Sequence, residues 1–194
     1  IRFICYDPEM TSAPPSQRHQ NPGHQAIVFA GGGTGGHLTP SLAIDAELQH
    51  VTPETPRHFI CSDRPIDMDI LRSAGVAFSP LAVRTWRSRP DHWPAWLLSN
   101  YRAMQQARKL LREMQAGCVV SLGGFVSAPV ILAACRMDIP VMMVLLDAAA
   151  GKAQRLLMRQ ADRIFATPLA AEATTQAHAI TTGFIADPQF WYLP

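Results

Sequence analysis

Short, continuous apolar runs alternate with longer segments of helical pattern through most of this chain, from Ala26 to Thr182. The apolar runs, rich in branched and aromatic residues, predict strands. They fall at 26–30, 57–62, 76–83, 118–122, 140–146, 163–167 and 179–182. Continuous rather than alternating apolar strands, separated by helices, are typical of a parallel sheet that is covered on both faces. We therefore expect an α/β fold with a Rossmann-like, doubly wound parallel sheet.

The segments between the strands carry the start and stop signals of helices. Thr39 followed by Pro40 predicts the N-cap and first residue of a helix running toward Leu48, and Gly75 ends a short helix at 67–75. A long helix is expected from about residue 95 to 115, with Gly117 as its stop. Further helices are expected at 127–137 and 152–161.

Composition narrows the class of protein. A chain of 194 residues with 48% hydrophobic and 16% charged residues can bury a sizeable core. Its net charge of +2 gives no reason to expect nucleic-acid binding. The four cysteines have neither zinc spacing nor a paired pattern, so we expect reduced thiols and neither a metal nor a cofactor. No stretch is long and apolar enough to span a bilayer.

The predicted boundaries give three parts. Residues 1–25 are polar and rich in Pro, Ser and Gln, and are expected to form a mobile leader. Residues 26–187 are expected to form one Rossmann-like domain, and 188–194 a tail or the start of a missing second domain.

Two glycine-rich loops follow strands of the predicted sheet, at 31–36 and 123–124. Ligands of such sheets bind beyond the carboxyl ends of the strands, where both loops are expected to lie. Glycine has no Cβ and tolerates positive φ, so consecutive N–H groups can turn toward a phosphate beside a helix N-terminus. A tight turn without a ligand remains open. So does a dinucleotide site, although Asp63 comes late for the usual ribose contact.

The residues around these loops resemble bacterial glycosyltransferases of family 28. "GGTGGH" at 32–37, followed by Pro40, is similar to the first glycine loop of that family, and "SLGGFVSAP" at 121–129 to the second. Ser121 and Phe125 stand where the family pattern has glycine and tyrosine. The pair Asp63–Arg64 after the second strand also matches, and the resemblance extends over roughly 26–184.

The resemblance implies a fold and an activity. The family has a two-domain (GT-B) fold, and this chain looks like its N-terminal, acceptor-binding half. Family members transfer N-acetylglucosamine with inversion from UDP-GlcNAc to an undecaprenyl-diphosphate-linked muramoyl-peptide, converting lipid I to lipid II in peptidoglycan synthesis. The implied partners are that donor, the polyprenyl-diphosphate acceptor and an anionic membrane surface. The implied location is peripheral, on the cytoplasmic face of the inner membrane.

The same resemblance assigns candidate site residues. His37 is the candidate catalytic base or a contact to the diphosphate, since imidazole exchanges protons near neutral pH. A histidine that only packs or caps is the alternative. The candidates for binding the acceptor diphosphate are Gly33, Thr34, Gly35, Gly36, Gly123, Gly124 and Ser127. For Ser127, a role as helix N-cap is equally open.

Four arginines and three tryptophans lie in the segment 84–102, "RTWRSRPDHWPAWLLSNYR". This composition suits the interface of an anionic bilayer, and the family carries a hydrophobic and basic patch here. The alternative is a helix that buries its Trp and Leu face in the core. The membrane-interface candidates are Arg84, Trp86, Arg87, Arg89, Trp93 and Trp96.

Two departures from the family pattern bear on activity. The family's polar H-E-Q-N cluster is replaced by "LLDA" at 145–148, where only Asp147 could act in the cleft, and its G-N-P-V-R by "GFIAD" at 183–187. The donor-binding domain would be missing or separate, as in a fragment or a split enzyme with a donor-half subunit, and the chain alone is expected to be inactive. The alternatives are a non-catalytic membrane-docking subunit or degenerate relative, and a dinucleotide-binding enzyme.

Overall fold

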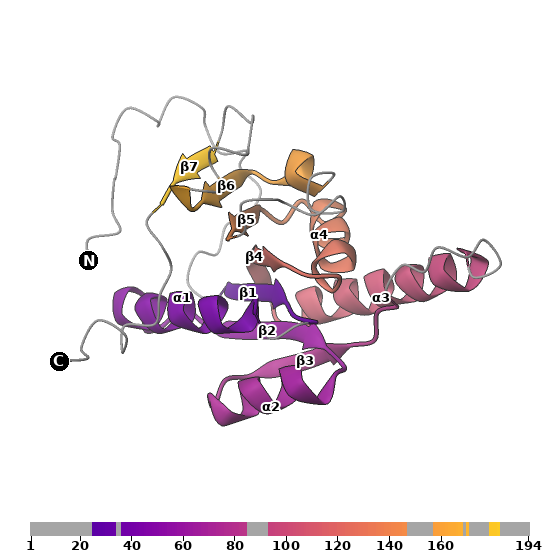
Figure 1. The fold of residues 1–194 in the computed structure, drawn as a ribbon, viewed down its shortest axis with the longest axis horizontal. Coiled ribbons are helices and arrows are strands. Elements are labelled where there is room, and N and C mark those ends of the chain that lie inside the picture. Colours follow the sequence, from indigo (N-terminus) through magenta and orange to yellow (C-terminus); the bar gives the residue numbers. More distant parts are fainter. Residues whose placement is uncertain are drawn as a thin grey trace.

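The computed structural model describes residues 25–33, 36–84, 93–146, 157–168, 170 and 179–182. They form a seven-stranded sheet in the order β3-β2-β1-β4-β5-β6-β7 (Figure 1). The strands are β1 Ala26–Gly31, β2 Arg57–Ser62, β3 Phe78–Leu81, β4 Ala116–Gly123, β5 Val141–Leu145, β6 Arg163–Ala166 and β7 Ala179–Thr181. All neighbouring strands pair in parallel, which confirms the predicted α/β class.

Helices cover both faces of this sheet. They are α1 Leu38–Val51, α2 Pro65–Ser73, α3 Trp93–Glu113 and α4 Ser127–Cys135, with a short 3₁₀ helix, η3, at Met158–Gln160. One apolar cluster joins Val28 and Ile60 of the sheet to α3 and α4. A second joins Phe29 and Phe59, whose rings stack 4.8 Å apart, to α1 and α2. Adjacent residues of one strand therefore enter opposite cores, which is why the strands are apolar along their whole length.

Several predicted helix boundaries are wrong. The N-cap of α1 is His37 and not Thr39, and α2 begins at Pro65. Helix α3 starts and ends about two residues early, and the turn after it is made by Gln115 with φ 50°. Gly117 consequently lies inside β4. The first part of the helix predicted at 152–161 lies outside the described residues.

The chain changes direction across the sheet between β3 and β4. It builds β1, β2 and β3 outward on one side and then returns to place β4 on the other side of β1. Gly31 at the end of β1 pairs with Gly123 at the end of β4. Both glycine loops thus leave the sheet side by side at the switch point where ligands of this fold class bind.

The predicted leader and tail of the chain are not covered by the described residues. The polar leader, apart from Gln25, and the tail at 188–194 are not among the described residues, so their predicted boundaries remain predictions. Within the described part of the chain, none of the helices combines the length and the apolar character needed to cross a bilayer.

Candidate functional site

The first glycine loop is tied to α2 by a buried carboxylate. Gly32 and Gly33 have φ values of 131° and 114°, a conformation that favours glycine. The N–H of Gly33 donates to Oδ2 of Asp67 at 2.6 Å, and the hydroxyl of Ser62 donates to the same oxygen. Asp67 is 0% exposed, and among the described residues its Oδ1 has no hydrogen-bond partner. The Asp67 carboxylate therefore holds the first glycine loop in place.

This contact bears on the prediction for Gly33. Its single amide proton is directed to Asp67, so Gly33 shapes the loop, and a contact of Gly33 with the acceptor diphosphate stays a prediction. The sequence offered little signal for Asp67, which lies 34 positions away and reaches the loop only because β2 pairs with β1.

The second glycine loop touches the first through its backbone. Gly123 and Gly124 also have positive φ values, 103° and 84°. A Cβ built on Gly124 would lie 2.2 Å from the carbonyl oxygen of Gly32, so the two loops leave no room for a side chain. The pair behaves as one structural unit.

Ser127 braces this unit. It is the first residue of α4, whose N-cap is Val126, so the predicted capping role is wrong. Its hydroxyl lies 2.7 Å from the carbonyl oxygen of Gly123 and 3.0 Å from that of Ala30, and its single proton is donated to one or shared between the two. The side chain is buried, at 2% exposure. A direct contact of Ser127 with a ligand stays a prediction, and the geometry favours the bracing role.

Arg64 and Phe125 lie across the junction of the loops. A Cβ on Gly33 would come within 2.2 Å of Cε1 of Phe125, so the ring packs directly on the first loop. The guanidinium of Arg64 lies over this ring, 5.0 Å from its centroid, and donates to the carbonyl oxygen of Gly33. Neither residue was among the predicted site residues. The ring contact needs no hydroxyl, so phenylalanine serves where the family pattern has tyrosine.

His37 follows the first loop at the start of α1. Its backbone is helical at φ −92°, and its side chain makes no capping hydrogen bond. Its Cβ lies 3.8 Å from the Cβ position of Gly31, which places the residue beside the end of β1. The ring atom Nδ1 is buried and has no hydrogen-bond partner among the described residues. A buried nitrogen left without a partner costs free energy, about 1–3 kcal/mol, and is a candidate for a functional contact.

The other predicted site residues divide into two groups. Gly36 is described and exposed in the turn before His37. Thr34, Gly35, Asp147, Trp86, Arg87 and Arg89 lie outside the described residues, so their roles remain predictions. Leu145 and Leu146, which replace the start of the family's polar cluster, are buried and half-buried at the end of β5.

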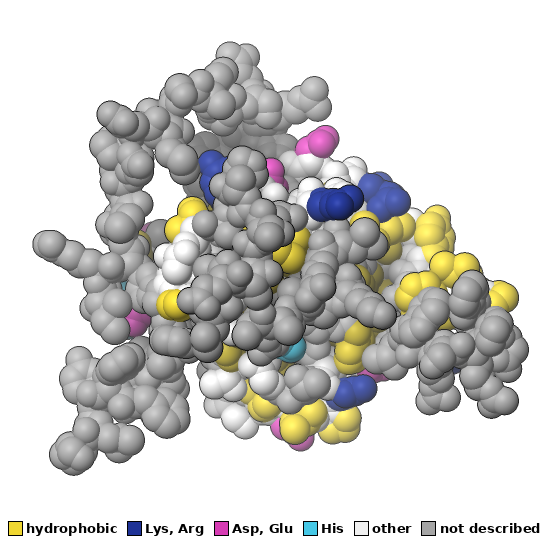
Figure 2. Space-filling model, turned by 45° about the horizontal axis from the view of Figure 1, so that its top comes forward, with side chains coloured by type: hydrophobic (Ala, Val, Ile, Leu, Met, Phe, Trp, Pro, Cys, Tyr) yellow, Lys and Arg dark blue, Asp and Glu magenta, His cyan; other side chains and the backbone are white. Residues whose placement is uncertain are grey.

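The predicted membrane segment gives α3 an exposed apolar surface. Leu97, Leu98 and Tyr101 are 60%, 50% and 57% exposed, and Arg84 and Arg102 are exposed as well. Trp93 begins the helix, and Trp96 is half-buried with its carbonyl accepting a hydrogen bond from Asn100. The end of α3 that carries this apolar surface projects past the sheet (Figure 1), and hydrophobic side chains gather there (Figure 2).

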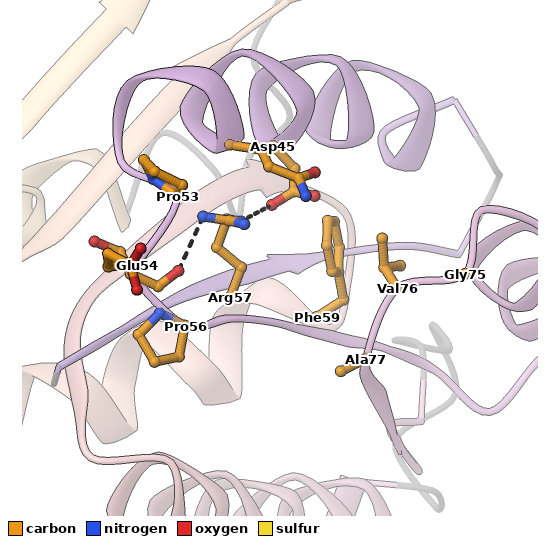
Figure 3. A pocket seen from close by; sticks show the side chains of 11 residues that line it. Asp45, Pro53, Glu54, Pro56, Arg57, Phe59, Gly75, Val76 and Ala77 are labelled. Atoms are coloured by element: carbon orange, nitrogen blue, oxygen red, sulfur yellow. Dashed lines mark hydrogen bonds and ion pairs between the residues drawn. The ribbon is translucent and has the colours of Figure 1, made fainter.

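A shallow cavity of about 310 Å³ lies at the opposite edge of the sheet, where strands begin (Figure 3). Its main polar group, Arg57, is 2.9 Å from Asp45 and donates to the carbonyl oxygens of Thr52 and Thr55. Burial raises the pKa of Asp45, and Arg57 opposes that shift. These groups join the end of α1 to β2, so we assign the cavity a structural role.

Cys61, beneath the site, is not a nucleophile candidate. It is fully buried at the end of β2. Burial, with the negative charge of Asp67 as the second cause, raises the pKa of its thiol to about 11. The thiol is therefore protonated at neutral pH and serves as part of the core.

A doubly wound parallel sheet with two joined glycine loops at its switch point places this chain in the class of Rossmann-like α/β domains. More particularly, residues 27–166 match the glycosyltransferase family 28 N-terminal domain, and the chain belongs to that family.

Curated relatives agree with this assignment. The UDP-N-acetylglucosamine–N-acetylmuramyl-(pentapeptide) pyrophosphoryl-undecaprenol N-acetylglucosamine transferase of Leuconostoc citreum is 31% identical over 139 residues, which are 71% of this chain and 38% of that protein. The transferase of the same name from Halothermothrix orenii is 37% identical over 139 residues, 71% of this chain and 37% of that protein. The chain thus spans well under half the length of these relatives.

A solved structure supports the fold. The crystal structure of Acinetobacter baumannii MurG superposes with a TM-score of 0.68 at 21% sequence identity, over 84% of this chain and 46% of that one.

Proposed function

We propose that this chain is the acceptor-binding half of an inverting N-acetylglucosaminyl transferase that acts on a polyprenyl-diphosphate-linked muramoyl-peptide. The single observation that carries the proposal is the union of the two glycine loops at the switch point, with an imidazole and a guanidinium beside them. The names of the curated relatives supply the donor and acceptor classes.

The residues of this chain would perform the acceptor's part of the reaction. His37 would accept the proton of the attacking sugar hydroxyl as a carbon–oxygen bond forms at the anomeric carbon and UDP departs. The rigid loop junction would hold the acceptor diphosphate, so that the hydroxyl meets the imidazole in one orientation. The UDP-GlcNAc donor would be held mainly by a further domain or a separate donor-half subunit.

A binding experiment tests this division of labour. We expect farnesyl diphosphate, a short acceptor mimic, to raise the unfolding temperature of the full chain, because a ligand that binds only the native state at 100 times its Kd adds about 2.7 kcal/mol of stability. UDP-GlcNAc is expected to produce a smaller shift and NAD none. Stabilisation by NAD without any effect of the diphosphate would contradict the proposal and favour a dinucleotide-binding protein.

We further propose that α3 docks the protein on an anionic membrane surface, at the cytoplasmic face of the inner membrane. The support is the exposed trio of Leu97, Leu98 and Tyr101 with the exposed arginines 84 and 102 beside it. Apolar side chains gain free energy by leaving water for the headgroup boundary, and arginine is attracted to lipid phosphate.

Replacing both Leu97 and Leu98 with glutamine should weaken binding to vesicles that contain an anionic phospholipid. Each leucine is already at least half exposed, so the change should leave the fold intact while removing about 1–2 kcal/mol of interfacial burial, or roughly 5- to 30-fold in the partition coefficient. Vesicle co-sedimentation measures the change.

Val51, which is 68% exposed at the end of α1, provides the matched control. Val51→Gln should bind vesicles like the unchanged protein. Equal binding by all three proteins would show that α3 is not the docking surface.

A further inference from the structure

We propose that Arg64 is the anion-binding residue of this site and holds the acceptor diphosphate directly. The inference rests on the proposed function and adds to it a residue and a mode of recognition. It comes from the position of Arg64, which contacts the carbonyl oxygen of Gly33 in the first glycine loop and the ring of Phe125, directly after the second.

The two contacts hold the guanidinium in place and leave several of its N–H donors unused. One N–H of Arg64 donates to the carbonyl oxygen of Gly33, while the contact with the Phe125 ring uses the cationic centre and no N–H. Arg64 lies exposed at the N-cap of α2, and within the described part of the chain no acidic side chain forms an ion pair with it. Because arginine carries five N–H donors in a planar fork, donors remain for a phosphate oxygen pair.

The charge around the loops shows why a cation is needed. The Gly33 amide, the expected phosphate donor, points to the Asp67 carboxylate instead. A buried carboxylate under the loop repels an approaching diphosphate, whereas peptide dipoles alone offer only partial charges. Arg64 donates to the carbonyl oxygen of the same Gly33 and so brings a full positive charge to the first glycine loop. The guanidinium would therefore attract a ligand with two phosphates, whereas a neutral ligand would gain no such attraction.

The Phe125 ring makes the arrangement rigid. It packs against Gly33 on one side and lies under Arg64. The guanidinium is thus positioned before a ligand arrives, and less side-chain entropy is lost on binding than for a free surface arginine.

The test measures binding of farnesyl diphosphate, inorganic pyrophosphate and farnesol to the full chain by titration calorimetry. We expect Arg64→Gln to raise the Kd for farnesyl diphosphate about tenfold or more and to weaken its dependence on salt concentration. Arg64→Lys should be intermediate, because lysine keeps the charge and loses the fork. Binding of farnesol, which has no phosphate, should be unaffected.

Arg72→Gln is the matched control. Arg72 is an exposed arginine on the same helix, α2, and its partner is Asp69 at 2.6 Å. This variant should bind all three compounds like the unchanged protein. Inorganic pyrophosphate separates a lipid-linked source of the diphosphate from a free one: we expect it to show the same dependence on Arg64 with a weaker affinity, since it lacks the apolar chain.

The possible results distinguish the role of Arg64 from the proposed acceptor-binding function. If the unchanged protein bound farnesyl diphosphate and Arg64→Gln bound it equally well, the role of Arg64 would be wrong and the acceptor function would stand. If the unchanged protein bound neither diphosphate, both proposals would fall. Should Arg64→Gln not fold, Arg64→Lys decides, and an unchanged Kd and salt dependence in that variant would overturn the inference.

Discussion

Replacing His37 with alanine is expected to lower the rate of N-acetylglucosamine transfer by about 10²–10⁴-fold, the usual contribution of a general base. The structure puts His37 directly after the first glycine loop, makes no use of its side chain as a cap, and leaves Nδ1 buried without a partner among the described residues. A side chain held there for packing alone would not need an imidazole.

A chimeric enzyme provides the assay, because this chain spans only 38% of its Leuconostoc citreum relative. Residues 27–166 of this chain would replace the matching segment of that transferase, and transfer from UDP-GlcNAc to a lipid-linked acceptor would be followed. His37→Ala should lower kcat, while farnesyl diphosphate should still bind, because the loops and Arg64 are unchanged.

His50→Ala is the control for this experiment. His50 is an exposed histidine in the last turn of the same helix, far from the glycine loops in the chain, and its loss should leave kcat unaltered. A chimera that transfers sugar equally well with and without His37 would contradict the role of a base. A chimera that binds acceptor and membranes but never transfers would favour the non-catalytic docking subunit.

The sheet and the meeting of the loops could be predicted because they depend on local patterns and one general rule. Runs such as 26–30 and 118–122 are apolar throughout, which indicates parallel strands, and such strands place the loops that follow them at one edge. The register Gly31 to Gly123 is what this reasoning leads to. Motif matching then selected the family.

The contacts that organise the site could not be predicted in the same way. Asp67 and Arg64 act on Gly33 only because β2 lies beside β1 and α2 begins immediately after it. Nothing in the local sequence distinguishes Asp67, which is buried, from Asp69, which is exposed two residues later. The burial of an acidic residue is set by tertiary packing and the donors it finds there, so sequence spacing carries little information about it.

Helix boundaries failed for a related reason. Thr39 and Ser127 are good N-cap residues by type, yet the helices begin one or more positions earlier than those signals indicate. At Ser127 the hydroxyl finds the carbonyl oxygens of Ala30 and Gly123, and this tertiary partner replaces the local one. Gln115 takes the left-handed conformation that was expected of a glycine, because the return into β4 requires it there.

Gly124→Ala should be among the most damaging single-methyl changes in the described chain, costing about 2–5 kcal/mol of unfolding free energy. The left-handed conformation at φ 84° accounts for about 1–2 kcal/mol of this with any Cβ. The remainder, about 1–3 kcal/mol, comes from overpacking, since the new Cβ would lie 2.2 Å from the carbonyl oxygen of Gly32, a backbone atom that cannot rotate away. Urea unfolding measures the change.

Gly75→Ala separates these two causes. Gly75 also has a positive φ, 68°, but a Cβ there would meet no atom within 4 Å. This variant should therefore lose only the conformational part, about 1–2 kcal/mol. Because Gly124 presses on Gly32, its substitution should also move the first loop and weaken binding of farnesyl diphosphate, whereas Gly75→Ala should leave binding unchanged. Equal losses of stability in the two variants, with binding intact in both, would show that the loops are not in the close backbone contact on which the candidate site depends.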